Sequence, residues 1–280
     1  MAPDPQGPAP GRESEPGRGR SLEERIVIDA TAEAVWRALT DAEELMRWFP
    51  LEARVEPGTG GTMWLSWDGP NGATARIEVW EPNRRLRTVE PRRDAAGRPV
   101  ELVVDYFIES EGGRTTLRVV HSGFGAGADW DAEYDGTGRG WRYELRGLRH
   151  YLHRHRGMPR RVAWVAARTS LSPEACYAGI MGAGLAQEGA VTGLDEGDPY
   201  RIVGGAGAFE GIVLVNRPPL DFAGTVANLN DALLRYEFYS GSPRLWVATW
   251  GVDETVVRGL EARLREIIVR AVPPEALKPA

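Results

Sequence analysis

The chain has 280 residues, of which 42% are hydrophobic and 26% are charged, and its formal net charge is −6. These values fit ordinary globular material in one large domain or two of usual size, and the acidic balance gives no overall field that would attract nucleic acid or anionic lipid. Without an apolar run of about eighteen residues or a basic-then-apolar leader, the sequence predicts a cytoplasmic protein with no membrane span.

The first elements follow a segment that is dominated by Pro, Gly and charge. Residues 1–20 cannot bury enough apolar surface to offset the cost of ordering, so we expect a disordered tail. A strand is expected over 24–29, and Thr31 then begins a short helix. Thr40 with Glu43 forms the pattern of a capping box for a second short helix.

This second helix ends in Arg-Trp-Phe. Leu45, Trp48 and Phe49 fall at helical spacing, so Trp48 and Phe49 should face inward, and Pro50 ends the helix. Strand signals bounded by Gly, Pro, Asn and Asp come next. They cover 62–67, 76–80, 86–89, 100–109 and 115–121. A helix from about 138 to 156 closes the unit, with an apolar stripe of Trp141, Leu145, Leu148 and Leu152.

The order of elements then restarts. Residues 169–181 align over residues 28–40 without a gap, with Ser172 beginning the helix. Strands are expected over 162–169, 233–239 and 244–250, and a closing helix over 255–270. Residues 211–222 echo residues 76–86 of the first copy. Self-similarity of this kind predicts two tandem copies of one α+β unit. We place the domains at 21–157 and 162–272, with a linker at 158–161 and a C-terminal tail at 273–280.

The opening of the first copy carries a family resemblance. RIVIDATAEAVWRALTDAEELMRWF (25–49) resembles the start of the activator of heat-shock protein 90 ATPase homologue family, within the SRPBCC or START-like superfamily. SWDGPNG (66–72), HSGF (121–124) and GWRYELRGLRHYL (140–152) also match, in the same order. The resemblance covers 22–156 and is weaker but collinear over 162–271.

The resemblance implies a fold and a kind of site. The fold would be two tandem helix-grip domains of the α+β class, each a curved antiparallel sheet wrapped around a long C-terminal helix. In this superfamily the space between sheet and helix often holds lipids, polyketides or other hydrophobic molecules.

Candidate ligand-binding residues come from strand phase and from the aromatic content of the first copy. Period two places Leu102, Val104, Tyr106 and Ile108 on one side of a strand, and it puts His121 on the apolar side of the next. His121 could orient a ligand or move a proton, or it could only bond loop backbone at a strand end. The candidate residues are Trp48, Phe49, Trp64, Trp80, Tyr106, His121, Trp141 and Leu145. The same aromatic rings could instead simply fill the core.

A basic stripe marks the helix that closes the first copy. Arg139, Arg142, Arg146 and Arg149 lie on or near one side of it. The stripe could bind an acidic protein partner, or it could be the solvated face of an amphipathic helix. Nucleic-acid binding is disfavoured, because no exposed aromatics are interleaved with these Arg residues.

Motifs for metal binding and catalysis are missing from the sequence. The single cysteine, Cys176, cannot form an intrachain disulfide, and with four His it cannot build a structural zinc site. The Gly-rich segment 204–211 lacks the Lys-Ser/Thr of a phosphate loop and predicts a hairpin or bulge. We therefore expect no metal, no cofactor and no assigned catalytic residue.

These observations favour binding of a small hydrophobic or amphipathic molecule in the first domain, with the second domain docked on the first. Two alternatives stay open. One is a polyketide aromatase/cyclase-type enzyme, which would need an acid or base beside His121 in a cavity. The other is a protein-interaction or chaperone-cofactor module, which would expose an apolar patch or use the Arg stripe.

Overall fold

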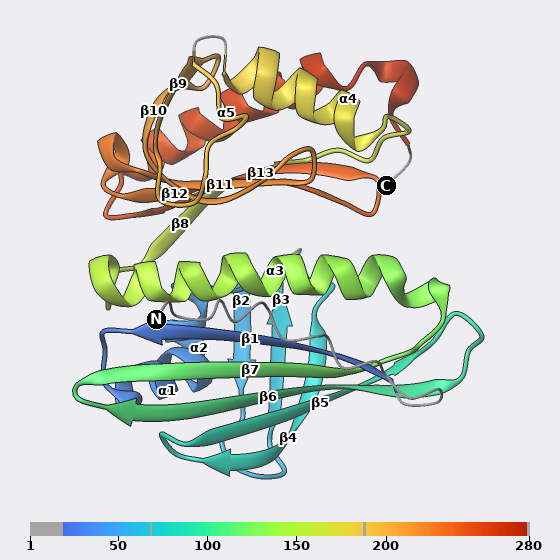
Figure 1. Cartoon of the computed structure of the whole chain (residues 1–280), viewed down its shortest axis with the longest axis vertical. Helices are drawn as coiled ribbons and strands as arrows, with labels where there is room; N and C mark the ends of the chain where they lie inside the picture. Colours follow the sequence, from blue (N-terminus) through green and yellow to red (C-terminus); the bar gives the residue numbers. More distant parts are fainter. Residues whose placement is uncertain (1–18, 68, 187–188, 279–280) are drawn as a thin grey trace, which may run out of the picture.

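The computed structural model describes residues 19–67, 69–186 and 189–278, so most of the segment expected to be disordered lies outside the described residues. Figure 1 shows two sheets stacked in layers with a long helix, α3, between them. Each sheet is antiparallel throughout. The architecture confirms the predicted fold class, two tandem helix-grip domains.

The first domain is a sheet of seven strands in the order β1-β7-β6-β5-β4-β3-β2. Its strands are β1 (Arg20–Ile28), β2 (Glu52–Val55), β3 (Thr62–Ser66), β4 (Ala73–Glu81), β5 (Arg85–Arg93), β6 (Pro99–Glu111) and β7 (Arg114–Phe124). Its helices are α1 (Ala32–Thr40), α2 (Ala42–Met46) and α3 (Asp131–His150), and a π-helical stretch, Tyr151–His155, continues α3.

The two short helices are capped in the manner that the sequence suggests, with one shift. Thr31 accepts a hydrogen bond from the Ala34 N–H at 3.2 Å, as an N-cap does. For α2 the cap is Asp41, which accepts from the Glu44 N–H at 3.0 Å, and not Thr40 as predicted. Thr40 is still helical, and its hydroxyl donates to the Trp36 carbonyl at 2.7 Å.

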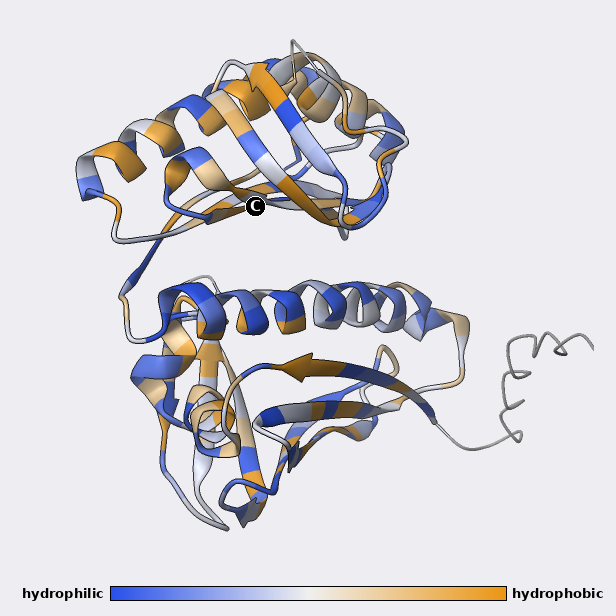
Figure 2. Ribbon diagram, turned by 60° about the vertical axis from the view of Figure 1, so that its left-hand side comes forward, coloured by the Kyte–Doolittle hydropathy of each residue, from blue (hydrophilic) through white to orange (hydrophobic). Residues whose placement is uncertain are grey.

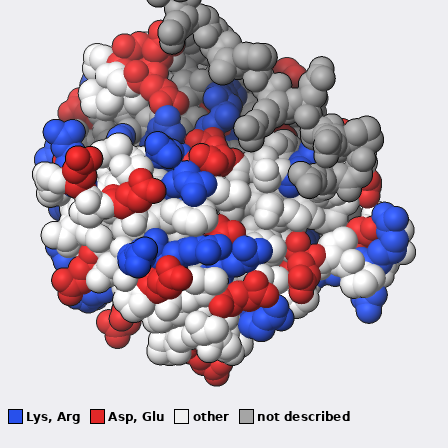
Figure 3. Space-filling view, turned by 60° about the horizontal axis from the view of Figure 1, so that its bottom comes forward, with Lys and Arg blue, Asp and Glu red and all other residues white. Residues whose placement is uncertain are grey.

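The first sheet has one dry face and one wet face. Its inner face packs Ile77, Leu86 and Leu117 against the apolar stripe of α3. On its outer face Arg85 and Arg87 both reach Asp105, at 2.8 and 3.4 Å. The view turned from the bottom of Figure 1 shows basic and acidic side chains interspersed (Figure 3). This alternation makes the inner face the one that can enclose a ligand.

The second domain is a sheet of six strands in the order β8-β13-β12-β11-β10-β9. Its strands are β8 (Arg160–Ala166), β9 (Pro199–Gly204), β10 (Gly207–Arg217), β11 (Asp221–Val226), β12 (Ala232–Tyr239) and β13 (Ser242–Trp250). Its helices are α4 (Pro173–Tyr177), which continues as a π-helix over Ala178–Leu185, and α5 (Glu254–Ala271).

The second sheet is buried on both faces, because α3 covers the face that α4 and α5 leave free. Along β12, Leu234 and Tyr236 belong to the core of the second domain. Leu233, the residue before Leu234, points to the opposite face and packs into the core of the first domain. Figure 2 shows α3 as a mostly hydrophilic ribbon with scattered apolar positions. The helix therefore meets the first sheet with its apolar stripe and the second sheet with a largely polar side.

Candidate functional site

A cavity of about 140 Å³ lies under α3, inside the curve of the first sheet. Small or apolar side chains from the inner face form most of its wall, including those of Met63, Ala75 and Leu102. Glu90, Tyr106 and His121 add polar atoms to this wall. The space under the helix is thus partly hollow and mostly apolar, as in small-molecule sites.

The adjacent aromatics after α2, Trp48 and Phe49, have different roles. Trp48 is an anchor, since it is buried and its indole N–H donates to the Ala38 carbonyl at 2.8 Å. Phe49 stacks on it with ring centroids 4.8 Å apart and also meets Trp67 and Trp141, at 5.0 and 5.8 Å. Phe49, Trp67 and Trp141 form an aromatic cluster where the cavity opens.

Side chains of the second domain bind the backbone at the end of α2, including that of Phe49. Arg160, the first residue of β8, donates hydrogen bonds to the carbonyls of Phe49 and Pro50. Trp250, the last residue of β13, donates from its indole to the Arg47 carbonyl at 3.0 Å. Carbonyls just beyond a helix end have no partner within the helix, so these side chains supply the bonds that water would otherwise make.

His121 presents an unused hydrogen-bond donor. The indole N–H of Trp141 donates to His121 Nδ1 at 3.1 Å. An indole nitrogen can only donate, so Nδ1 accepts and the ring proton of neutral His121 sits on Nε2. Burial, with a smaller effect of Arg92, lowers the pKa of His121 to about 4. Nε2 is buried and has no hydrogen-bond partner among the described residues.

A second hollow of about 340 Å³ lies between the domains and adjoins the cavity. It shares the aromatic cluster and His121 with the cavity, and this common set of side chains places the two hollows next to each other. Gly136, Thr137 and Gly140 of α3 form one side of this interdomain groove. Tyr239 and Arg244 of the second domain are on the other side.

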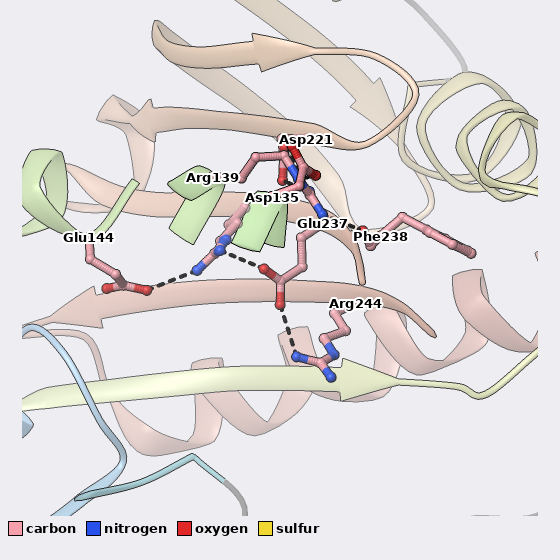
Figure 4. A network of polar contacts seen from close by, with 8 residues as sticks. Asp135, Arg139, Glu144, Asp221, Glu237, Phe238 and Arg244 are labelled. Carbon is pink, nitrogen blue, oxygen red and sulfur yellow. Dashed lines mark hydrogen bonds and ion pairs between the residues drawn. The ribbon is translucent and has the colours of Figure 1, made fainter. Parts of the chain in front are cut away.

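A buried chain of charges crosses from α3 to the second sheet beside the groove (Figure 4). Arg235 donates to Glu144 at 2.9 Å and pairs with Glu237 at 2.5 Å, while its guanidinium lies 4.1 Å from the Tyr143 ring centroid. Glu237 also accepts from Arg244 at 3.2 Å. Burial raises the pKa of Glu144 to about 7, against the lowering effect of Arg235.

The predicted site residues separate into two groups. Phe49, Tyr106, His121 and Trp141 line the cavity or the groove. Trp48 and Leu145 line neither hollow and are buried in the same core. The structure places Trp64 and Trp80 elsewhere.

Neither of these two tryptophans lines the cavity or the groove. Trp64 lies under the Arg54 guanidinium, 4.5 Å from its ring centroid, and Trp80 meets Trp36 edge-on at 5.0 Å. Trp67, which the sequence analysis did not select, lines both hollows instead. Strand phase could have identified it, because Trp67 has the same parity as the inward-facing Met63 and Leu65.

The Arg stripe of α3 is largely engaged within the chain. Arg139 donates to both carboxylate oxygens of Asp221, each at 2.9 Å, and Arg146 pairs with Glu196 at 2.5 Å. Both partners belong to the second domain. Arg142 donates to Glu24 of β1 at 2.9 Å. Arg139 and Arg146 therefore fasten the two domains to each other.

Neither a metal cluster nor a membrane helix occurs in the described ranges. No three His, Cys, Asp or Glu side chains there are grouped so that they could hold a metal ion. No helix among these residues is both long enough and apolar enough to cross a bilayer. Cys176 is buried and free, and burial raises the pKa of its thiol.

Residues 29–153 match the family model described as "Activator of Hsp90 ATPase homolog 1-like protein". The match shows that the first domain is similar to this family over most of its length. The predicted resemblance is confirmed from α1 to α3, including strands β2 to β7 between them. This range contains the cavity and the aromatic cluster. No curated protein matches the chain.

Among solved structures, protein MLL2253 from Mesorhizobium loti is 25% identical over 49% of this chain and 98% of its own, with a TM-score of 0.44. CalU16 from Micromonospora echinospora is 28% identical over 49% of this chain and 80% of its own, with a TM-score of 0.38. The di-domain ARO/CYC BexL from the BE-7585A biosynthetic pathway is 15% identical over 90% and 98%, with a TM-score of 0.43. Similarities at this level carry no information about function.

Proposed function

We propose that the first domain binds a small, largely apolar molecule that carries a hydrogen-bond acceptor, such as a carbonyl oxygen. The observation that carries the proposal is the buried Nε2–H of His121, which has no partner among the described residues. A buried donor without an acceptor costs about 1–3 kcal/mol, so a ligand oxygen placed there would recover that free energy.

The walls support an apolar body for this molecule. The cavity alone, about 140 Å³, is small, but the adjoining groove adds about 340 Å³. Together they reach the range of roughly 300–1,000 Å³ that is usual for small-molecule sites. Phe49 and Trp141 offer ring faces where the two hollows meet, which suits a flat or aromatic ligand.

The main test is to purify the protein from its native host under mild conditions and to identify small molecules that co-elute with it. The wild type should carry one molecule with a carbonyl or similar oxygen at a stoichiometric level. His121→Phe keeps a ring of similar size and removes the donor, so it should carry roughly tenfold less. Wild-type protein that is free of ligand, and whose Trp fluorescence ignores a panel of aromatic ketones, would overturn the proposal.

A matched pair on α3 tests the geometry. Trp141→Ala removes a ring from the cavity wall and the hydrogen bond that fixes His121. Arg142→Ala removes only an ion pair with Glu24 on the other side of the helix. Trp141→Ala should weaken ligand binding much more than Arg142→Ala, and equal effects would contradict the site.

A second function, acid–base catalysis on the bound molecule, is supported by the polar set in the cavity. Glu90 and Tyr106 line it together with His121, and burial raises the pKa of Glu90. Co-purified molecules distinguish the two functions. If Glu90→Gln carries a different molecule from the wild type, the variant has accumulated a substrate and the site is catalytic. The same molecule in both proteins would support binding alone.

A further inference from the structure

We propose that the two domains share one binding site, in which the interdomain groove holds a carboxylate attached to the apolar molecule of the first domain. This inference rests on the proposed function and adds to it the second domain and an anionic group on the ligand. The recognising residue is Arg244 of β13, which lines the groove.

Arg244 has hydrogen-bonding capacity that remains unused in the groove. Both carboxylate oxygens of Glu237 are engaged, one by Arg235 and the other by Arg244 Nη1. Within the described residues, Nε and Nη2 of Arg244 have no hydrogen-bond acceptor, although the side chain is only 31% exposed. Paired N–H groups of a guanidinium match a carboxylate, and charge-assisted bonds of this kind are about twice as strong as neutral ones.

The α3 side of the groove is shaped by a glycine. Gly140 lies inside a helix, where Gly costs about 0.5–1 kcal/mol relative to Ala. A Cβ at Gly140 would meet nothing within 4 Å. Packing in the unliganded protein therefore gives no reason for a missing side chain there. The absence of a Cβ keeps the groove open between the His121 end and the Arg244 end.

The cavity and the groove are continuous through the residues that they share. His121, with its unused Nε2–H, lines both hollows, and Arg244 lines only the groove. A molecule whose body occupies the cavity would pass the aromatic cluster and extend toward β13. The ligand class is thus an amphipathic acid: an apolar, preferably aromatic body, an acceptor oxygen near it, and a carboxylate at the far end.

The test uses the full chain and a series of 2-naphthyl carboxylic acids with methylene linkers of increasing length, each paired with its primary amide. Binding is measured by calorimetry and by quenching of Trp fluorescence. In the wild type, the best acid should bind about tenfold to a hundredfold more tightly than its amide. Arg244→Gln should abolish this preference.

The matched control is Arg258→Gln, which removes the same charge from an exposed ion pair on α5, where Arg258 lies 3.4 Å from Glu254. It should keep the preference for the acid. Gly140→Ala fills the groove without touching an ion pair, and it should weaken the longer acids severalfold while the protein stays folded. This second variant keeps the test decisive if Arg244→Gln disturbs domain docking.

The outcomes separate the two proposals. If the wild type binds acid and amide equally well, or if Arg244→Gln keeps the preference, the shared site is wrong and a cavity ligand remains. If neither probe of any length binds, the cavity function fails, and the shared site fails with it.

Discussion

Each of the two domains wraps a sheet around a helix, but the space between sheet and helix differs between the domains. Under α3 the first sheet leaves a cavity, and on the groove side of that helix Gly140 meets open space. Under α5 the second sheet packs Tyr236, Phe222 and Leu264 into one buried cluster. There Gly184 lies so close to Ile267 that a Cβ would approach its Cγ2 to 2.5 Å. The same residue type keeps space open in one domain and permits close packing in the other.

The outer faces differ as well. The first sheet turns a solvated face with surface ion pairs outward, whereas the second sheet uses its corresponding face to cover α3. In the second domain this face of the sheet is an interface, whereas in the first domain it is solvated and the cavity lies on the opposite face. Because the closely packed second domain lies against α3 of the first domain, residues of both domains line the groove.

The largest expected effect concerns the buried charges of that interface. Arg235→Met should lower the free energy of unfolding by about 3–5 kcal/mol, because Glu144 would remain buried without its cation and Glu237 would keep only Arg244. Urea denaturation measures it. Arg258→Met, in an exposed pair, should change stability by less than about 0.5 kcal/mol. Similar small losses for both would show that the interface does not depend on this cation.

The next effect is acid sensitivity at the domain junction. His150 Nε2 donates to the Asp231 carbonyl at 2.6 Å. Burial, with smaller effects of His155 and Arg154, lowers the pKa of His150 from 6.5 to about 4, against the raising effect of Asp231. Between pH 6.5 and 4 the unfolded chain therefore takes up a proton that the folded chain refuses, so stability falls as the pH falls. The loss should be about 2–3 kcal/mol.

His150→Gln removes this titration, so its stability should depend less on pH in that window than that of the wild type. Urea denaturation at several pH values compares the two slopes. Equal slopes would mean that His150 is not held neutral by the interface.

A smaller effect tests the filled domain. Gly184→Ala should destabilise the protein by about 1–2 kcal/mol, because the added methyl group meets Ile267. Thermal unfolding followed by circular dichroism measures this change. A neutral or stabilising result would show that the second domain is not closely packed around Gly184.

The smallest effect has the opposite sign and tests the hollow domain. Gly140→Ala should stabilise the protein by about 0.5–1 kcal/mol, since Ala favours the helix and its methyl group meets no atom. The same thermal assay applies. A loss of stability would imply that this side of the groove closes in solution.

The fold was largely predictable because its main elements carry strong periodicity. Both copies and the apolar stripe of α3 follow from spacing alone. The misses are β2, β9 and β11, which are short, and the start of α3, which begins at Asp131 and not near Gly138. Asp and Gly have low helix propensity, and here tertiary contacts such as Tyr239 against Gly136 override it.

The site was predictable only on the side of the first domain. Strand phase places Tyr106 and His121 on the inner face. It places Trp67 there as well, although Trp67 is absent from the predicted site residues. The polar side of α3 looked like a solvated surface, because a single sequence does not say what covers it. One signal was present in β12, where the adjacent Leu233 and Leu234 indicate a strand buried on both faces.

The hold of Arg160 and Trp250 on the carbonyls after α2 has a thermodynamic consequence. A guest that displaces the Phe49 ring also perturbs the peptide groups to which the second domain is bonded. Linkage makes this relation reciprocal, so whatever factor a guest imposes on interdomain affinity, closing the domains imposes on the guest. Ligand binding in the first domain would then change the strength of its association with the second domain.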